Sequence, residues 1–144
     1  MNIAVFGASG QTGKLFVDQA LAAGHMLTAL VRDPTKLGVN HPNLQIVHGD
    51  ALDKVAVEAA VRDMQVVVSL LAKVKDTPNE LLPISAEYII SAMHIFGVRR
   101  LIVCAPVAIP FEDDAKSALQ SVGAFISKLN GRRTVKPENA FVDL

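Results

Sequence analysis

GASGQTG, at residues 7–13, carries more structural information than any other segment of this 144-residue chain. The short apolar run Ile3–Phe6 precedes it and is typical of a buried strand. Apolar residues then recur at helical spacing over Thr12–Ala23, and Gly24 ends that helix. The run Met26–Val31 predicts a second strand. A glycine loop that leaves a strand and opens a helix, with another strand close behind, predicts a βαβ unit.

Each glycine of this loop has a physical role. Gly7 permits the sharp turn out of the strand, Gly10 lets the backbone approach a phosphate, and Gly13 lets the helix pack close to the sheet. The free N–H groups and the dipole of the helix start favour a bound anion. We therefore expect the pyrophosphate of a dinucleotide here, the alternative being a glycine-rich turn without a ligand. The side chains that can add hydrogen bonds are Ser9, Gln11 and Thr12.

The rest of the chain alternates between strand-like and helix-like segments. Further strands are expected at Leu44–Val47, Gln65–Leu71 and Arg100–Cys104, and helices at Lys54–Arg62, Pro78–Phe96 (started or interrupted at Pro83) and Asp113–Asn130. This order predicts an α/β fold with a doubly wound parallel sheet of about five strands. A hydrophobic fraction of 51% suits strands that helices cover on both faces. We expect one domain over residues 1–144, with an irregular tail at 131–144.

Charge and cysteine content narrow the class of protein. Lys plus Arg and Asp plus Glu both number 14, and no basic stripe points to nucleic acid. The apolar runs are too short to span a bilayer, and the N-terminus has no basic segment of a signal peptide. The single cysteine, Cys104, excludes an internal disulfide framework and fits a reducing compartment. We therefore expect a cytoplasmic protein with no nucleic-acid or membrane partner.

The residue after the second strand indicates which dinucleotide is bound. An NAD site usually has an acidic residue there for the ribose 2′-hydroxyl, whereas this chain has Arg32. Asp33 follows, but Pro34 places it in a turn, where we expect it to act as a cap. The guanidinium of Arg32 suits a 2′-phosphate, and Lys36 adds a second positive charge. The pattern favours NADPH over NADH, the alternative being that Arg32 is an ordinary solvated residue.

Asp50 follows the third strand, and two roles are open for it. In this architecture the loop after that strand passes beside the adenine, so the carboxylate of Asp50 can accept the adenine amino group and Ala51 can supply backbone contacts. The alternative role is that of N-cap for the helix Lys54–Arg62, because aspartate is a favoured cap residue.

These motifs together resemble a known family. The glycine loop, Leu30-Val31-Arg32-Asp33 and Gly49-Asp50 resemble the atypical short-chain dehydrogenase/reductases, in particular the NAD(P)H-binding group around biliverdin reductase B (flavin reductase) and the NmrA-like proteins. The resemblance runs from Met1 to about Cys104. It implies a Rossmann fold, a preference for NADPH, and reduction of a flavin, a quinone or a similar planar acceptor.

The resemblance also implies roles for individual residues. Those that hold the pyrophosphate are Gly7, Ser9, Gly10, Gln11, Thr12 and Gly13. Arg32 and Lys36 face the 2′-phosphate, and Asp50 and Ala51 the adenine. The residues that line the cofactor after the fourth strand are Leu70, Leu71 and Ala72, and those near the nicotinamide ribose are Cys104, Ala105 and Pro106.

The chain departs from this family in two ways. The run Val103–Val107 lacks the serine or threonine expected after the fifth strand, and the single tyrosine, Tyr88, has Ala92 rather than a lysine four residues on. No acid–base pair or metal spacing is visible, so no catalytic residue is assigned, and Cys104 is expected to be buried and inert. We also expect this chain to lack the sixth strand and closing helices that the resemblance implies, and an uncovered edge of the fifth strand then favours a homodimer.

Three functions fit these observations. The first is an NADPH-dependent reductase, because the cofactor supplies the hydride chemistry and solvent can supply the proton. The second is a non-catalytic NADP(H)-binding redox sensor or regulator of the NmrA-like type, which the missing hydroxyl favours. The third is a stable Rossmann domain with little function of its own, since a fold does not settle function.

Overall fold

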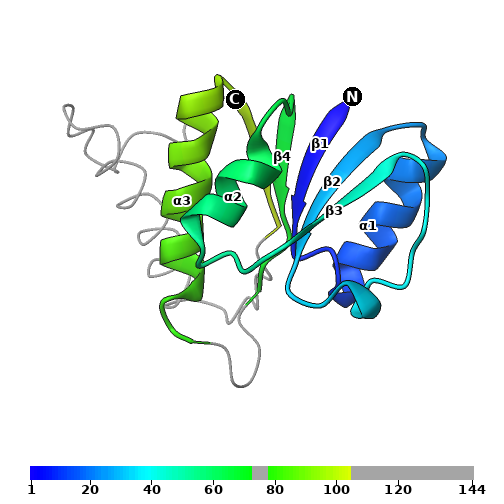
Figure 1. Cartoon of the computed structure of the whole chain (residues 1–144), viewed down its shortest axis with the longest axis horizontal. Coiled ribbons are helices and arrows are strands. Elements are labelled where there is room, and N and C mark those ends of the chain that lie inside the picture. Colours follow the sequence, from blue (N-terminus) through cyan, green and yellow to red (C-terminus); the bar gives the residue numbers. More distant parts are fainter. Residues whose placement is uncertain (73–77, 105–144) are drawn as a thin grey trace, which may run out of the picture. The chain divides into compact units, whose positions relative to one another are not determined.

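Alternating strands and helices build a parallel sheet in the computed structural model, which describes residues 1–72 and 78–104 (Figure 1). The elements in chain order are β1 (Asn2–Phe6), α1 (Gln11–Ala22), β2 (Met26–Val31), the 3₁₀ helix η1 (Pro34–Lys36), β3 (Leu44–His48), α2 (Lys54–Val61), β4 (Val66–Ser69), α3 (Leu81–Phe96) and β5 (Arg100–Val103). The described part lies within the compact unit Met1–Pro106. The expected helix Asp113–Asn130 and the tail 131–144 lie outside it, so one domain over the whole chain stays a prediction.

The order of the strands confirms the doubly wound topology. The sheet runs β3-β2-β1-β4-β5, and all four neighbouring pairs are parallel. The chain begins in the middle at β1, moves outward through β2 and β3, and returns to the other side of β1 for β4 and β5. The chain therefore leaves the neighbouring strands β1 and β4 in opposite directions. Open α/β sheets bind ligands at the carboxyl ends of two such strands.

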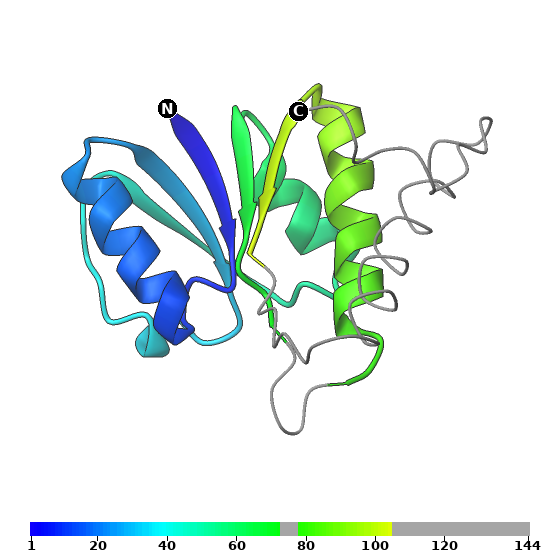
Figure 2. The ribbon, with the colours of Figure 1, turned by 180° about the vertical axis from the view of Figure 1, so that it is seen from behind.

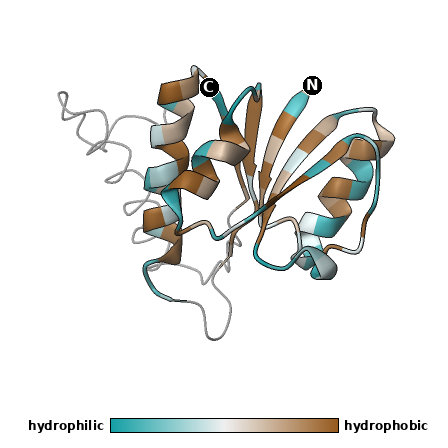
Figure 3. Cartoon of the chain, viewed as in Figure 1, coloured by the Kyte–Doolittle hydropathy of each residue, from teal (hydrophilic) through white to brown (hydrophobic). Residues whose placement is uncertain are grey.

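Helices cover the three central strands β2, β1 and β4 on both faces, and this explains why these strands read as continuous apolar runs. Ile3 and Val5 of β1 share a core with Val17 of α1, whereas Ala4 and Phe6 share the opposite core with Ile89 of α3. Figure 1 shows α2 and α3 on one side of the sheet and α1 on the other. In Figure 3 the strands are mostly hydrophobic along their length. Two-sided burial removes the polar alternation of a half-exposed strand.

The helices begin and end close to the predicted residues. α3 starts at Leu81, and Pro83 therefore lies in its first turn, where the missing N–H has no intrahelical partner to lose. Gly97 ends α3 in the left-handed conformation at φ +70°. The three α-helices span 12, 8 and 16 residues, and none in the described part is long and apolar enough to cross a membrane.

Gly49, directly after β3, lets α2 approach the sheet. A Cβ at this position would lie 2.5 Å from the Cβ of Ala56 and 3.3 Å from Cδ1 of Leu30. We expect Gly49→Ala to lower the free energy of unfolding by about 1–3 kcal/mol, because the added methyl group overpacks this contact. Urea denaturation measures the change.

Val55→Ala is the matched control for this substitution. Val55 lies on α2 and is 73% exposed, so its truncation to alanine should change the free energy of unfolding by less than about 0.5 kcal/mol. A loss of that size or smaller in Gly49→Ala would show that α2 shifts freely and would contradict the packing role of Gly49.

Candidate functional site

The carboxyl ends of all five strands lie at one edge of the sheet, and the predicted binding residues follow them. The glycine loop 7–13 follows β1, Arg32 follows β2, and Asp50 follows β3 by one residue. Leu70 and Cys104 directly follow β4 and β5. In Figure 1 this is the lower edge of the sheet, where α1 also begins. The structure thus brings the predicted residues of the described part to one edge, whereas Ala105 and Pro106 lie outside the described residues.

Two of the loop glycines are required by close backbone packing. Gly7 has φ +82°, and a Cβ there would lie 2.7 Å from the carbonyl oxygen of Leu70. A Cβ on Gly13 would overlap the carbonyl oxygen of Gly7 and lie 2.7 Å from the carbonyl carbon of Ala8. The loop is therefore held between the exit of β4 and the first turn of α1. The spacing predicts that Gly13 lets the helix pack close to the sheet, and the backbone that it approaches is that of the loop directly after β1.

Gly10 has a different environment, because it is exposed at the start of α1. A Cβ on it would have one neighbour within 4 Å, the carbonyl oxygen of Gly7 at 3.4 Å. Gly10 is the N-cap of α1, so no side-chain cap binds the first-turn N–H groups. Gln11 and Thr12 of that turn are exposed, and Ser9 is half-buried. An uncapped helix start beside an open glycine fits the pyrophosphate of a dinucleotide.

Arg32 and Lys36, the two cations predicted to face a 2′-phosphate, each lie beside a carboxylate. Nη1 of Arg32 is 3.9 Å from Oδ2 of Asp50, and Nζ of Lys36 is 3.9 Å from Oδ2 of Asp33. The cationic side chains are 75% and 73% exposed. Ion pairs this exposed add little stability, so both cations remain available to a phosphate.

Asp33 caps η1, as its position before Pro34 indicates. Its Oδ1 accepts hydrogen bonds from the hydroxyl of Thr35 at 2.6 Å and from the backbone N–H of Thr35 at 3.1 Å. The hydroxyl hydrogen bond is the main reason that the pKa of Asp33 lies below its usual value. Asp33 is therefore ionised at neutral pH and already engaged in the turn.

The alternative role of Asp50 as the cap of α2 is wrong. Asp53 caps this helix, because its Oδ1 accepts from the N–H groups of Val55 at 2.9 Å and Ala56 at 3.4 Å. Asp50 instead forms a turn in which its Oδ1 accepts from the N–H of Leu52 at 2.9 Å. The turn places three residues between Asp50 and the helix, so Asp50 is too early in the chain to cap it.

The expectation that Cys104 is buried is also wrong. Its backbone N–H donates to the carbonyl oxygen of Ser69 at 2.9 Å, but the residue itself is exposed. Ile102 and Val103 before it are 43% and 61% exposed. Among the described strands, β5 is an edge strand with β4 as its one neighbour (Figure 2), which leaves its end accessible. By contrast, Leu70, Leu71 and Ala72 after β4 are half-buried.

Sequence reasoning missed two residues beside the predicted phosphate site. His48 ends β3, pairs with Val31 in the sheet, and forms a hydrogen bond through Nε2 to the carbonyl oxygen of Arg32 at 2.9 Å. Thr35 holds the carboxylate of Asp33. The sequence signal for His48 was its position at the end of the strand expected to lie next to β2, because neighbouring parallel strands end side by side.

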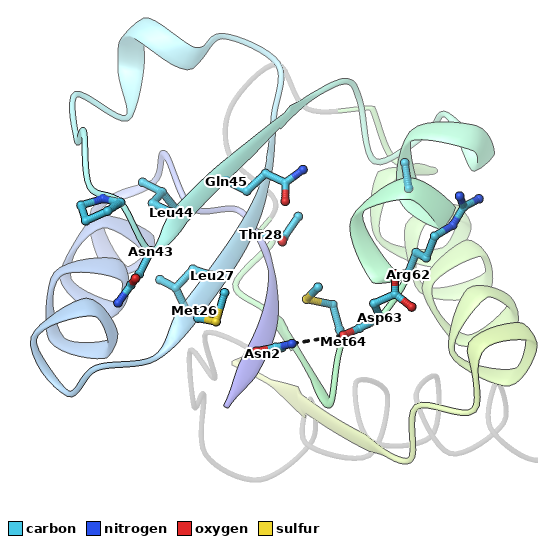
Figure 4. A pocket seen from close by; sticks show the side chains of 12 residues that line it. Asn2, Met26, Leu27, Thr28, Asn43, Leu44, Gln45, Arg62, Asp63 and Met64 are labelled. Atoms are coloured by element: carbon cyan, nitrogen blue, oxygen red, sulfur yellow. Dashed lines mark hydrogen bonds between the residues drawn. The ribbon is translucent and has the colours of Figure 1, made fainter.

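A cavity of about 410 Å³ lies at the opposite edge of the sheet (Figure 4). It is lined by the amino ends of β1, β2 and β3 and by residues that follow α2, including Arg62 and Asp63. The side-chain amide of Asn2 donates to the backbone carbonyl of Asp63 at 3.5 Å. Ligands of open α/β sheets bind at the carboxyl ends of the strands. This cavity is therefore separate from the predicted dinucleotide site.

Comparison with known proteins agrees with the geometry of the carboxyl edge. A family model described as NAD(P)H-binding matches residues 7–136. Isoflavone reductase homolog P3 of Arabidopsis thaliana is 32% identical over an alignment of 152 positions, gaps included, that covers 94% of this chain and 44% of that protein. This chain therefore spans less than half the length of that curated relative.

Solved structures share the fold. A Rossmann-fold NAD(P)-binding family protein from Shigella flexneri superposes with a TM-score of 0.64 at 27% identity, over 86% of this chain and 61% of that one. Uronate dehydrogenase from Agrobacterium tumefaciens, a mutant of which was solved in complex with NAD, has a TM-score of 0.68 at 20% identity, over 89% of this chain and 55% of that one. At that identity the second similarity shows the fold alone.

Proposed function

Because this chain belongs to the NAD(P)H-binding family, as its resemblance to the atypical short-chain dehydrogenase/reductases predicted, we propose that it is an NADPH-dependent oxidoreductase. Its acceptor in this proposal is a flavin, a quinone or a similar small planar molecule. The observation that carries the proposal is the pairing of two features at one sheet edge. These are the uncapped, glycine-lined start of α1 and the exposed guanidinium of Arg32 after β2.

The state of Asp33 supports NADPH over NADH. An acidic residue near the end of β2 selects NADH when its carboxylate accepts the ribose 2′-hydroxyl. Here Oδ1 of Asp33 accepts two hydrogen bonds from Thr35, and Oδ2 faces Lys36. That carboxylate is therefore engaged, while Arg32 and Lys36 present exposed cationic groups of the kind that bind phosphate.

In this proposal the protein's own part is to bind and orient. A nicotinamide cofactor supplies the hydride. The α1 start holds the pyrophosphate, Asp50 and Ala51 face the adenine, and Leu70–Ala72 line the cofactor beyond β4. Flavins and quinones can take a proton from solvent, so the proposal needs no protein acid.

A non-catalytic NADP(H)-binding sensor is the second candidate. The exit of β5 favours it, because Cys104 presents an exposed thiol there in place of the hydroxyl residue that the family resemblance leads one to expect. A sensor requires the phosphate-binding half of the site but no acceptor.

Two measurements test both candidates. Fluorescence titration with NADPH and NADH measures binding, and the loss of reduced-nicotinamide absorbance with FMN, a quinone or an azo dye measures turnover. We expect NADPH to bind about tenfold more tightly than NADH, equivalent to about 1.4 kcal/mol, and to be oxidised by at least one acceptor. Tight binding without turnover of any acceptor would support the sensor. Failure to bind either nucleotide would contradict both candidates.

A further inference from the structure

Two pairs of oppositely charged side chains follow β2 and β3 where the 2′-phosphate is predicted, and their formal charges cancel. Asp50 lies beside Arg32 and Asp33 lies beside Lys36, each at 3.9 Å. A phosphate therefore meets two cations that already have counterions. The affinity of Arg32 for a phosphate therefore depends on how strongly Asp50 competes for the same guanidinium.

The carboxylate of Asp50 accepts a backbone hydrogen bond, whereas the side chain of Arg32 is largely exposed. Oδ1 of Asp50 accepts the N–H of Leu52 at 2.9 Å, which leaves Oδ2 directed at Arg32. The side chain of Asp50 is 39% exposed, compared with 75% for Arg32. The turn after β3 holds Asp50 in place, so a phosphate that binds Arg32 must compete with this carboxylate.

We propose that Asp50 is a specificity-determining residue that, as the resident counterion of Arg32, holds the preference for NADPH over NADH below the level that Arg32 alone would produce. This inference rests on the proposed NADPH site. Its physical basis is competition, because a phosphate must draw Arg32 away from Asp50 before the guanidinium can bind it. The pair is exposed to solvent, so the effect is moderate and weakens as salt is added.

A contact between Asp50 and the adenine is separable from this role. Adenine is common to NADPH and NADH, so an adenine contact alters both affinities by the same factor and cancels in their ratio. The counterion role changes the affinity for NADPH, which alone carries the 2′-phosphate. The ratio of the dissociation constant of NADH to that of NADPH therefore reports the counterion role.

Asp50→Asn tests the inference in the full 144-residue chain. Asparagine keeps an oxygen to accept the N–H of Leu52 but removes the charge. At low ionic strength we expect the NADH-to-NADPH ratio of dissociation constants, measured by fluorescence titration, to rise about three- to tenfold. Asp53→Asn is the matched control, because it also removes one carboxylate charge. Asp53 lies three residues after Asp50 and caps α2. This control should leave the ratio within about twofold.

The same substitution in an Arg32→Ala background identifies the route of the effect. If Asp50 acts through Arg32, Asp50→Asn should then change the ratio by less than about twofold. Two results would overturn the inference but leave the NADPH site in place. One is an equal rise of the ratio in both backgrounds, and the other is an unchanged ratio in Asp50→Asn although the wild-type chain binds NADPH. A wild-type protein that binds neither nucleotide, or an Arg32→Ala variant that loses both equally, would overturn the NADPH site and the inference together.

Discussion

Gly13→Ala should weaken the binding of NADPH and NADH alike by about a hundredfold and lower the free energy of unfolding by about 3 kcal/mol. The added Cβ would overlap the carbonyl oxygen of Gly7 and lie 2.7 Å from the carbonyl carbon of Ala8. These are backbone atoms, so α1 must move away from the loop after β1. That movement breaks packing and displaces the N–H groups that are predicted to hold the pyrophosphate.

Gly10→Ala separates these two consequences. Gly10 has φ −72° and ψ 168°, which alanine adopts without strain, and the nearest atom to its added Cβ lies at 3.4 Å. Stability should change by less than about 0.5 kcal/mol, while both nucleotides bind about tenfold more weakly because the methyl group projects toward the phosphates. Urea denaturation and fluorescence titration measure the two effects. Full nucleotide affinity in Gly13→Ala would contradict the assigned role of the loop.

Arg32→Ala should raise the dissociation constant of NADPH by about 10- to 100-fold and that of NADH by less than about twofold. Loss of a charge-assisted hydrogen bond to the 2′-phosphate accounts for the first change, and NADH lacks that group. The ion pair with Asp50 is exposed, so the substitution should leave the thermal midpoint nearly unchanged. Parallel fluorescence titrations with the two nucleotides measure the selectivity.

Arg62→Ala is the control for the loss of one positive charge. Arg62 lines the cavity at the opposite edge of the sheet and its guanidinium lies 5.6 Å from the ring centroid of Phe96. Its removal should leave both nucleotide affinities within about twofold, because the charge is distant and screened. Equal weakening of NADPH and NADH in Arg32→Ala would refute its contact with the 2′-phosphate.

Much of the fold was readable in the sequence because it depends on local patterns. Short apolar runs predicted all five described strands, and the segments between them predicted α1, α2 and α3. The spacing of the loop predicted a sharp turn at Gly7 and close packing at Gly13. The φ of +82° at Gly7 and the distance from Gly13 to Ala8 confirm these two predictions. In each case residues close in the chain carry the signal, either as a periodicity or as a backbone conformation that glycine alone adopts readily.

The tertiary structure was needed wherever two distant segments meet. A strand-end pattern places Arg32 and Asp50 at one edge, but their ion pair and the fixed turn of Asp50 depend on how the exits of β2 and β3 fold. The exposure of Cys104 likewise depends on what covers β5, which composition does not encode. Local sequence therefore specified the strands, the helices and the glycine loop, whereas the ion pair beside the predicted phosphate site arises from a contact between residues that follow two separate strands.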